Sequence, residues 1–447
     1  MNLIASNVTT VIAGIGVTGL SVARYLARRG QPFVLVDSRA APPAWNEACA
    51  AFPDQVLASD HFGAELFCSA GKLVVSPGLS LVRDDIQAAV AAGVPVLGDI
   101  ELFVREARAP IAAITGSNGK STVTTLLGEM ARSAGRRVAV GGNLGTPALD
   151  LLADDVDLYV LELSSFQLET CLELGAAVAC VLNVSPDHMD RYATLQDYHR
   201  AKHRIFRKVG KVVFNRDDVL SRPLLSDDVP RWSFGLDRAD VHGYGVAEQD
   251  GAQWLWREFT PLLPLAEMGL RGRHNVANGL AALALGEQLG LPLAPMLDAL
   301  RSFRGLPHRC ELIADRDGVA WINDSKGTNV GATLAAVEGL GADHNLILIA
   351  GGQGKGADFS PLAPAVARHV RELVLLGEDA EAVATALRAV ATPHFVTDLN
   401  AAVQRAHQLA RPGDTVLLSP ACASLDMFAD FEDRGRQFTR AVEALSR

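Results

Sequence analysis

The sequence predicts an α/β protein with three domains, each built on a mainly parallel sheet with helices. Short apolar runs alternate with longer amphipathic segments along most of the chain, which is typical of βαβ units. Hydrophobic residues make up 49% of the chain and aromatic residues only 6%, a mixture that suits buried strands covered by helices rich in Ala and Leu. At 447 residues the chain is also too long for a single hydrophobic core.

The first two domains are expected over residues 1–98 and 99–306. In the first domain, strands are predicted over 8–14, 32–37, 73–76 and 94–98, with a helix over 18–29. In the second domain, strands are predicted over 111–115, 137–140, 158–163, 178–184 and 212–215, with helices over 120–134, 195–208 and 275–290. Residues 231–268 are punctuated by Trp, Gly and Pro without a helical period, and we expect a small antiparallel patch there.

The third domain is expected over residues 307–447. Leu306, Pro307 and His308 resemble a hinge that leads into it. Residues 311–322 are interrupted by Asp317-Gly318, a dipeptide that predicts a β-hairpin. Further strands are predicted over 346–350, 372–376, 394–396 and 415–418, and helical segments separate them.

Charge and cysteine usage exclude several classes of partner. The formal net charge of −10 disfavours a surface for polyanions, so we expect no nucleic-acid partner. The six cysteines are scattered without a Cys-x-x-Cys pair, which argues against a disulfide framework or a zinc site. The first residues lack the regions of a signal peptide, and no apolar run reaches the length of a membrane span. We therefore expect a cytoplasmic protein without membrane insertion.

The first glycine-rich loop is Gly-Ile-Gly-Val-Thr-Gly at residues 14–19, between a predicted strand and a helix. Glycines there let the backbone approach a pyrophosphate, whose charge is favoured by the helix N-terminus. Asp37 ends the next predicted strand, where a carboxylate can reach a ribose or a base. This Rossmann-like pattern fits NAD, FAD or a nucleotide sugar, and it also fits a tight turn that needs glycine only for steric reasons.

A second loop, Thr-Gly-Ser-Asn-Gly-Lys-Ser-Thr at residues 115–122, ends like a P-loop. Its backbone N–H groups would cradle phosphates, Lys120 would neutralise the β/γ oxygens and Ser121 would ligate Mg²⁺. The loop is a shorter variant of the usual pattern, because Ile114 occupies the position of the first glycine. A surface turn rarely places Gly-Lys-Ser-Thr after an apolar strand, so we predict that the central domain is a P-loop domain that binds a nucleoside triphosphate.

Two later groups suit a metal site beside the P-loop. Glu162 lies at the end of a predicted strand, where a Walker-B-like Mg²⁺ ligand is found. The loop at 183–191 follows the next strand and carries His188, which alone would be interpreted as a satisfied hydrogen-bonding residue. Loops at the carboxyl ends of neighbouring strands converge on one crevice, and this favours a shared site. Lys202, on the following helix, is ambiguous because exposed helical lysines are ordinary.

Polar groups recur in the rest of the chain. Asn275 and Asn278 lie near a helix start, where Asn275 also suits an N-cap. In the third domain, polar strings at 323–329, 351–355 and 419–424 each follow a predicted strand, so a polar rim is expected at the strand ends of a Rossmann-like sheet. Cys422 has no basic neighbour in the sequence, and we interpret it as a structural thiol.

These strings together resemble the Mur ligase family, the ATP-dependent enzymes that build the stem peptide of peptidoglycan. The resemblance covers essentially the whole chain and is carried by TGSNGKST, ELSSFQLE, NVSPDHMDRY, PHRCE, NDSKGTNVG, GGQGKGADFS and LSPACASLDMF. Gly327 is a small departure, because Ala is more usual there. NDSKGTN and SPACASLD resemble most the branch that adds D-glutamate. The resemblance therefore implies an ATP-dependent amide-bond ligase of cell-wall synthesis that adds D-glutamate to UDP-N-acetylmuramoyl-L-alanine through an acyl phosphate.

The resemblance also implies which residues hold each ligand. The UDP-substrate would contact Gly14, Ile15, Gly16, Val17, Thr18, Asp37, Ser38, Arg39, Ser76, Pro77, Gly78 and Asn143. ATP would contact Gly116, Ser117, Asn118, Gly119, Lys120, Ser121, Thr122, Asn275, Asn278, Arg309 and Asp324. D-Glutamate would contact Thr328, Lys355, Ser424, Leu425 and Phe431. Two Mg²⁺ ions would be held by Ser121, Glu162, His188 and an N-carbamylated Lys202. Lys120, His188 and Lys202 would be the catalytic residues, and we expect a monomer.

Other interpretations stay open from the sequence. Sister ligases that add L-alanine, a diamino acid or a dipeptide, and folylpolyglutamate synthetase, share the same ATP-dependent chemistry. An NAD-dependent dehydrogenase would use residues 14–19 and Asp37, but it leaves the P-loop unexplained. A P-loop regulator without chemistry leaves the polar rim of the third domain unexplained.

Overall fold

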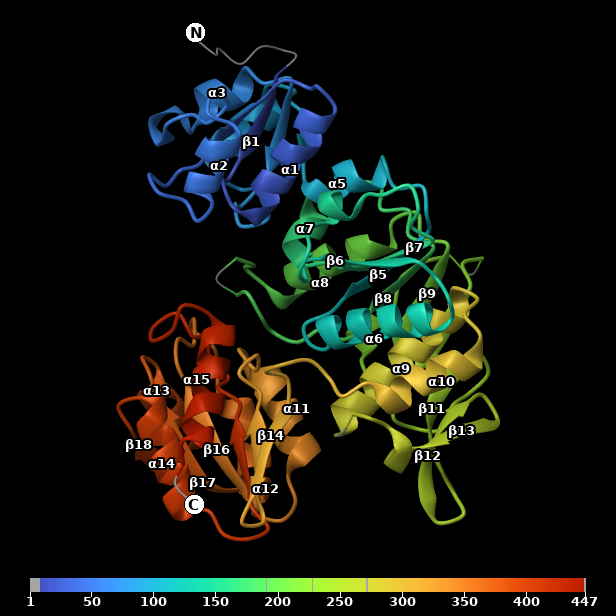
Figure 1. The fold of residues 1–447 in the computed structure, drawn as a ribbon, viewed down its shortest axis with the longest axis vertical. Coiled ribbons are helices and arrows are strands. Elements are labelled where there is room, and N and C mark those ends of the chain that lie inside the picture. The colour runs from blue at the N-terminus through green and yellow to red at the C-terminus, as the bar shows by residue number, and fades with distance from the viewer. Residues whose placement is uncertain (1–8, 190, 227, 271, 446–447) are drawn as a thin grey trace.

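The computed structural model describes residues 9–189, 191–226, 228–270 and 272–445, and they form three sheets (Figure 1). Val8, the first residue of the expected first strand, lies outside the described residues, as does Asp190 in the loop that carries His188. Each sheet has helices packed on it, and each contributes loops from the carboxyl ends of its parallel strands. The α/β class and the mainly parallel sheets are confirmed.

The first sheet has the order β2-β1-β3-β4, and all its neighbouring strands are parallel. Its strands are β1 (Thr10–Ala13), β2 (Phe33–Val36), β3 (Lys72–Val75) and β4 (Val96–Leu97). Its helices are α1 (Val17–Arg28), α2 (Trp45–Ala51), α3 (Ala64–Cys68) and α4 (Asp84–Ala91). Every residue of β1 and β2 is buried, because helices cover both faces of a parallel sheet. The continuous apolar runs in the sequence follow from this burial.

The central sheet has nine strands in the order β13-β12-β11-β10-β9-β8-β5-β7-β6. The strands are β5 (Ile111–Thr115), β6 (Val138–Gly142), β7 (Leu158–Glu162), β8 (Val178–Val181), β9 (Lys211–Asn215), β10 (Arg231–Phe234), β11 (Gly243–Gln249), β12 (Ala252–Arg257) and β13 (Thr260–Pro264). The helices are α5 (Asp99–Val104), α6 (Lys120–Ser133), α7 (Ser165–Glu169), α8 (Leu195–His203), α9 (Arg273–Gln288) and α10 (Leu293–Ser302).

The expected antiparallel patch over 231–268 needs correction. β10 is parallel to β9, and β11 is parallel to β10, so only β11, β12 and β13 form an antiparallel meander. The segment therefore continues the central sheet through β10, and its antiparallel part begins only at β11. Trp232 lies within β10 and Trp254 and Trp256 lie within β12, and residues of this type favour strands without determining the direction in which a strand pairs.

The third sheet has the order β14-β15-β19-β16-β17-β18, and its strands are parallel except for the β14–β15 hairpin. The strands are β14 (Glu311–Arg316), β15 (Val319–Asn323), β16 (Leu346–Gly351), β17 (Val370–Leu376), β18 (Pro393–Phe395) and β19 (Thr415–Leu418). The helices are α11 (Val330–Leu340), α12 (Ala363–His369), α13 (Ala380–Leu387), α14 (Leu399–Leu409) and α15 (Phe431–Glu443). The hairpin turn is the predicted one, with positive φ angles of 53° at Asp317 and 74° at Gly318.

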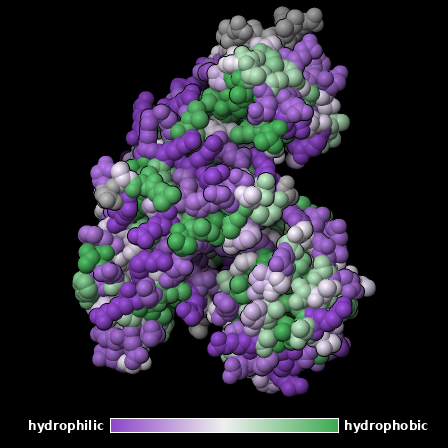
Figure 2. Space-filling view, turned by 180° about the vertical axis from the view of Figure 1, so that it is seen from behind, coloured by the Kyte–Doolittle hydropathy of each residue, from purple (hydrophilic) through white to green (hydrophobic). Residues whose placement is uncertain are grey.

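The three sheets form separate lobes that are joined in chain order (Figure 1). The chain passes from the central lobe to the third lobe through residues 303–310, where Gly305, His308 and Cys310 all have positive φ angles. Hydrophilic side chains are spread over every lobe, with smaller apolar patches among them (Figure 2). Among the helices that the structure describes, none is long and apolar enough to cross a membrane.

Candidate active site

The P-loop connects β5 to α6, as predicted, and its shape depends on one glycine. Gly119 has a φ of 81°, and a Cβ at this position would lie 2.4 Å from Oδ1 of Asn278. Glycine therefore permits both the left-handed conformation and the close approach of α9. The first turn of α6 begins at Lys120, so the free N–H groups of this helix face the loop.

Side chains from the loop after β8 hold the P-loop in place. Oδ1 of Asn183 accepts the backbone N–H of Asn118 at 2.8 Å, and Nδ2 of Asn183 donates to Asn118 O at 3.1 Å. Ser117 Oγ donates to Ser185 O at 2.9 Å and accepts the Ser185 N–H at 3.0 Å. The loops after β5 and β8 therefore meet at the sheet edge, as their order in the sequence predicted.

A hydroxyl and a carboxylate meet beside the P-loop. Ser121 Oγ donates to Glu162 Oε2 at 2.5 Å, and Asn143 Nδ2 donates to Glu162 Oε1 at 2.7 Å. Nη2 of Arg309, from the connection to the third lobe, donates to Ser121 Oγ at 2.6 Å. Hard oxygen donors of this kind suit Mg²⁺. Within the described ranges, no group of three or more His, Cys, Asp and Glu side chains is placed to hold a metal ion, so phosphate oxygens would have to complete the coordination.

Lys120 is held against the loop that it follows. Its Nζ donates to Gly116 O at 2.9 Å and to Ser117 O at 3.0 Å. Burial lowers the pKa of Lys120, while the negative charges of Glu162 and Asp187 oppose that shift. The ammonium group thus lies where the phosphates of a nucleotide would be cradled, as expected of a P-loop lysine.

Lys202 is a buried residue and not a surface lysine. It is 1% exposed, its Nζ donates to Gly116 O at 2.8 Å, and that nitrogen lies 4.3 Å from the ring centroid of Tyr198. Burial lowers the pKa of Lys202 well below its ordinary value, and the charge of Lys120 lowers it further. The ambiguity that the sequence left at Lys202 is therefore resolved in favour of a buried residue.

His188 lies in the same region with a left-handed backbone, at a φ of 56°. Its ring is 4.8 Å from the ring of Phe166, and its Nε2 is 3.7 Å from Oδ2 of Asp187. Burial lowers the pKa of His188, and the nearby charge of Lys120 adds to that effect, whereas Asp187 opposes it. A neutral imidazole can accept a proton or ligate a metal ion.

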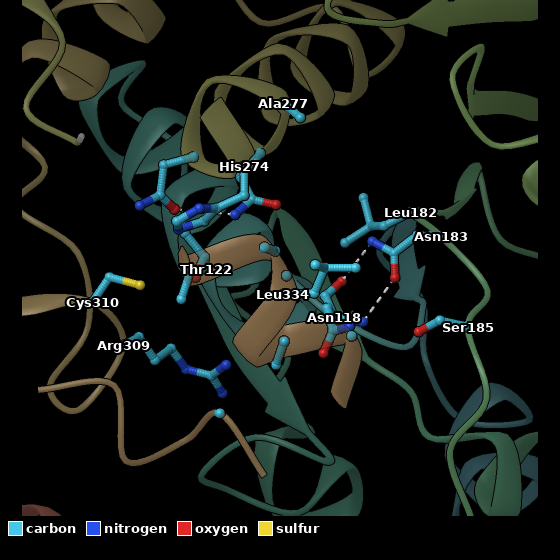
Figure 3. Close-up of a pocket in the computed structure, with 18 of the residues that line it drawn as sticks. Asn118, Thr122, Leu182, Asn183, Ser185, His274, Ala277, Arg309, Cys310 and Leu334 are labelled. Atoms are coloured by element: carbon cyan, nitrogen blue, oxygen red, sulfur yellow. Dashed lines mark hydrogen bonds between the residues drawn. The ribbon is translucent and has the colours of Figure 1, made fainter. Parts of the chain in front are cut away.

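Seven of the eleven expected nucleotide residues line a cavity of about 370 Å³ between the central and third lobes, whereas Ser117, Lys120 and Ser121 line a neighbouring cavity. Arg309 and Cys310 lie on the opposite side of this cavity from Asn183 and Ser185 (Figure 3). Its lining includes the predicted residues Asn118, Gly119, Thr122, Asn275, Asn278, Arg309 and Asp324. Both lobes therefore contribute walls to the cavity, so it exists only when the lobes are near each other.

A larger cavity of about 730 Å³ brings the catalytic and metal residues together with part of the amino-acid set. Its lining includes Ser117, Lys120, Ser121, Asn143, Glu162, His188, Lys202, Thr328 and Lys355. Ser424, Leu425 and Phe431 are absent from the described lining of this cavity. Ser424 is buried and the side chain of Leu425 is 64% exposed, while the ring of Phe431 lies 3.7 Å from Nζ of Lys326.

Eleven of the twelve expected UDP residues line a third cavity of about 640 Å³ between the first and central lobes. Its lining includes Gly14, Gly16, Val17, Thr18, Asp37, Ser38, Arg39, Ser76, Pro77, Gly78 and Asn143. Ile15 is fully buried and lines none of the described cavity, although its N–H donates to Asp37 Oδ2 at 2.8 Å. Asn143 also lines the 730 Å³ cavity, so the two spaces adjoin at this residue.

Asp37 braces the glycine-rich loop and also pairs with Arg39. Its oxygens accept the Ile15 N–H and the Arg39 guanidinium, at 2.8 Å and 2.9 Å. Burial opposes ionisation of Asp37, but hydrogen bonds from Arg39 and Ile15 keep its pKa below the ordinary value. A carboxylate committed to these partners is a poor acceptor for a dinucleotide ribose, which weakens the dehydrogenase interpretation.

Two residues of the site were missed in the sequence. Lys326 lines both the nucleotide cavity and the 730 Å³ cavity. Asn329 caps α11 and donates from Nδ2 to Asn118 Oδ1 at 3.4 Å and to Asp187 Oδ2 at 3.3 Å. Both residues lie in the polar segment 323–329, which the sequence analysis had singled out. The sequence of that segment does not indicate which of its side chains contact the central lobe.

Lys326 should give the activity an alkaline limit. Burial lowers its pKa to about 8, and the charges of Arg309 and Lys120 act in the same direction. Lys326 is protonated and positively charged below that pKa and loses its proton above it. The value of kcat/KM should therefore fall as pH rises through about 8. Lys326→Arg should move this limb upward, because a guanidinium stays protonated. Wild type and variant are compared over the same pH range, so that ionisation of the substrates affects both profiles equally. Alkaline limbs that superimpose would show that Lys326 does not set this limit.

Family comparisons agree with the three-lobe division. The model described as Mur ligase MurD-like, N-terminal domain, matches residues 8–98. The Mur ligase middle domain matches residues 114–286, and the Mur ligase, glutamate ligase domain, matches residues 308–422. These matches lie over the first, central and third sheets in turn.

Curated proteins and solved structures resemble the chain over its full length. It is 58% identical to the UDP-N-acetylmuramoylalanine--D-glutamate ligase of Pseudomonas aeruginosa and 53% identical to that of Marinobacter nauticus, covering 100% of both chains in each case. The crystal structure of UDP-N-acetylmuramate-alanine ligase MurC from Thermotoga maritima superimposes with a TM-score of 0.61 at 20% identity, covering 98% of this chain and 99% of that one. At that identity, the structural likeness shows a shared fold.

Proposed function

This chain belongs to the Mur ligase family, and we propose that it joins D-glutamate to UDP-N-acetylmuramoyl-L-alanine with the use of ATP. It is an ATP-dependent amide-bond ligase of peptidoglycan precursor synthesis. The observation that carries the proposal is the 730 Å³ cavity, where Lys120 and Glu162 of the central lobe lie in one space with Lys355 of the third. A phosphoryl donor and an amino acid bound from opposite lobes can meet there.

We assign one ligand to each domain. Residues 1–98 would bind the UDP-substrate, residues 99–306 would bind ATP and residues 307–447 would bind the amino acid. The cavity between the first and central lobes, with most of its lining from residues 14–79, supports the first assignment, and the P-loop supports the second. The 640 Å³ and 730 Å³ cavities adjoin at Asn143, and the L-alanyl carboxylate would extend past this residue from the UDP site toward the phosphates of ATP. Thr328 and Lys355 would receive D-glutamate in the cavity, with Ser424, Leu425 and Phe431 completing that site.

Two Mg²⁺ ions fit the donor chemistry of this site. Ser121 and Glu162 would hold one ion, because their oxygens already share a hydrogen bond beside the P-loop. His188 and an N-carbamylated Lys202 would hold the other, because a carbamate supplies the anionic oxygens that Mg²⁺ prefers. When bound, the ions would neutralise phosphate charge during transfer.

The proposed mechanism has two transfers. The L-alanyl carboxylate attacks the γ-phosphorus of ATP, so ADP leaves and an acyl phosphate forms. The neutral amine of D-glutamate then attacks the acyl carbon, a proton and phosphate leave, and an amide remains. Lys120 counters the charge of two approaching anions, and lobe closure would exclude the water that hydrolyses acyl phosphates.

We also propose that the enzyme works as a monomer in the cytoplasm. The described residues of this chain supply walls to all three cavities, which supports a site built within one copy. ATP and UDP-linked precursors are the substrates, and these are cytoplasmic compounds.

The proposal predicts strict dependence on both acceptor and amino acid. ADP and phosphate should form only when UDP-N-acetylmuramoyl-L-alanine and D-glutamate are both present with ATP, and a new amide should appear in equal amount. Radiolabelled D-glutamate followed into the UDP-product measures this directly. Equal kcat/KM with L-alanine, meso-diaminopimelate or L-lysine would instead indicate a sister ligase of the family.

A further inference from the structure

The third lobe contains a buried arginine that the proposed mechanism does not use. Arg434 lies on α15 and is 2% exposed. Its Nε donates to Ser325 Oγ at 3.0 Å and its Nη2 to Ser325 O at 2.8 Å. Both Nη1 and Nη2 donate to Cys422 O at 3.2 Å, and Nη1 also reaches Ala423 O at 3.4 Å. In the part of the chain that the structure describes, no carboxylate forms an ion pair with this guanidinium.

The acceptors of Arg434 belong to two loops that are far apart in the sequence. Ser325 follows β15, whereas Cys422 and Ala423 follow β19, the neighbouring strand of the sheet. Ser325 Oγ in turn donates to Phe431 O at 2.8 Å, at the start of α15. One planar group with five fixed donors therefore sets the distance between two loops at the carboxyl ends of their strands.

A third loop is attached through Ala423. The backbones of Gln353 and Ala423 exchange hydrogen bonds of 3.0 Å and 2.9 Å. The preceding residue, Gly352, has a φ of 125°, and a Cβ there would lie 2.3 Å from Ala423 O and 3.4 Å from Nη1 of Arg434. The loop after β16 therefore packs closely on the backbone that Arg434 holds.

We propose that Arg434 is a positioning residue for the amino-acid substrate. Each of the three loops carries a residue of the proposed D-glutamate site, namely Thr328, Ser424 and Lys355. These residues follow Ser325, Ala423 and Gln353, the residues whose backbones form the hydrogen bonds just described, by no more than three positions. Arg434 would align these side chains with one another without contacting the substrate. This inference rests on the proposed function.

The charge of Arg434 persists despite its burial. Burial lowers its pKa to about 10, so the guanidinium is still protonated at neutral pH. A lysine could keep the charge, but its single nitrogen cannot span three carbonyl acceptors and one hydroxyl acceptor on two loops. Arg434→Lys is therefore the variant that removes the positioning while it keeps the cation.

Steady-state kinetics with each substrate varied in turn test the inference. Arg434→Lys should raise the KM for D-glutamate about 10- to 100-fold, because several charge-assisted hydrogen bonds lose their geometry. The KM values for ATP and the UDP-substrate should stay near those of wild type. Ser325→Ala, which removes one acceptor and leaves the guanidinium, should raise the same KM by a smaller factor. Arg440→Lys on the exposed face of α15 is the matched control and should change none of the three.

A merely structural role would lower the melting temperature or the active fraction and leave the KM for D-glutamate unchanged in both variants, and that result would overturn the inference. If Arg434→Lys does not fold, Ser325→Ala decides the question alone. Wild type assayed in parallel separates the two proposals. Wild type that makes no ADP in response to D-glutamate refutes the proposed function, whereas active wild type with variants of unchanged KM refutes only the positioning role.

Discussion

Replacing Lys120 with alanine should lower kcat by about 10³-fold, the size of effect seen when one preorganised electrostatic contact to a transition state is lost. Lys120 Nζ lies on the carbonyls of Gly116 and Ser117, at the point where the γ-phosphoryl group would be transferred. The UDP cavity is lined by the first lobe and by a different part of the central lobe, so binding of that substrate should be nearly unchanged. Single-turnover kinetics would measure the first effect and calorimetric titration the second.

Lys72→Ala is the matched control for this variant, because Lys72 is an exposed lysine of the first lobe. It should alter neither kcat nor the affinity for the UDP-substrate. A Lys120→Ala enzyme that lost UDP-substrate affinity in proportion to kcat would contradict the assignment of the two ligands to separate domains.

Replacing Lys202 with alanine should lower kcat roughly 100-fold or more, because the second metal site would lose its anionic ligand. Burial beside Lys120 lowers the pKa of this amine well below its ordinary value, and this favours the neutral amine, the form that attacks CO₂ to give a carbamate and a proton. Acetate should partly restore turnover to Lys202→Ala by filling the vacated anionic position. Lys202→Arg should stay impaired, since a guanidinium keeps its charge and cannot be carbamylated. Turnover measured across an acetate series separates these cases.

Lys208→Ala provides the control for Lys202, because the Lys208 side chain is 64% exposed and pairs with Glu173 at the surface. It should be as active as wild type and insensitive to acetate. Full activity of Lys202→Arg would show that the residue acts as a cation. A mass spectrum of wild type prepared in bicarbonate, compared with Lys202→Arg, gives an independent measure of carbamate formation.

Much of the fold follows from local patterns in the chain. Strands buried on both faces leave continuous apolar runs, and this is why β1, β5 and β16 were predicted within a few residues of their ends. Pairing direction is a long-range property, so the parallel junction of β10 with β11 could not be predicted from its Trp-rich segment. The helix expected over 195–208 ends at His203, before Arg204–Phe206 tightens into a 3₁₀ turn.

The candidate site was predictable where one loop carries its own chemistry. Lys120 and Ser121 belong to a P-loop that residue order alone identifies. Lys202 was ambiguous because burial, which decides its chemistry, depends on packing between α8 and the P-loop. Asn329 bridges two lobes and Arg434 bridges two loops, and such roles arise only when distant segments meet.

The nucleotide cavity has walls on two lobes that are joined by residues 303–310, and this makes the connecting segment a tether. A ligand clamped between tethered bodies binds with an intrinsic affinity multiplied by the fraction of time in which the two walls face each other. The segment therefore sets the local concentration of one wall relative to the other. His308 and Cys310 hold positive φ angles that residues other than glycine rarely adopt, so a change of backbone at these two positions would alter how the walls face each other and, with that, the affinity for a nucleotide bound between them.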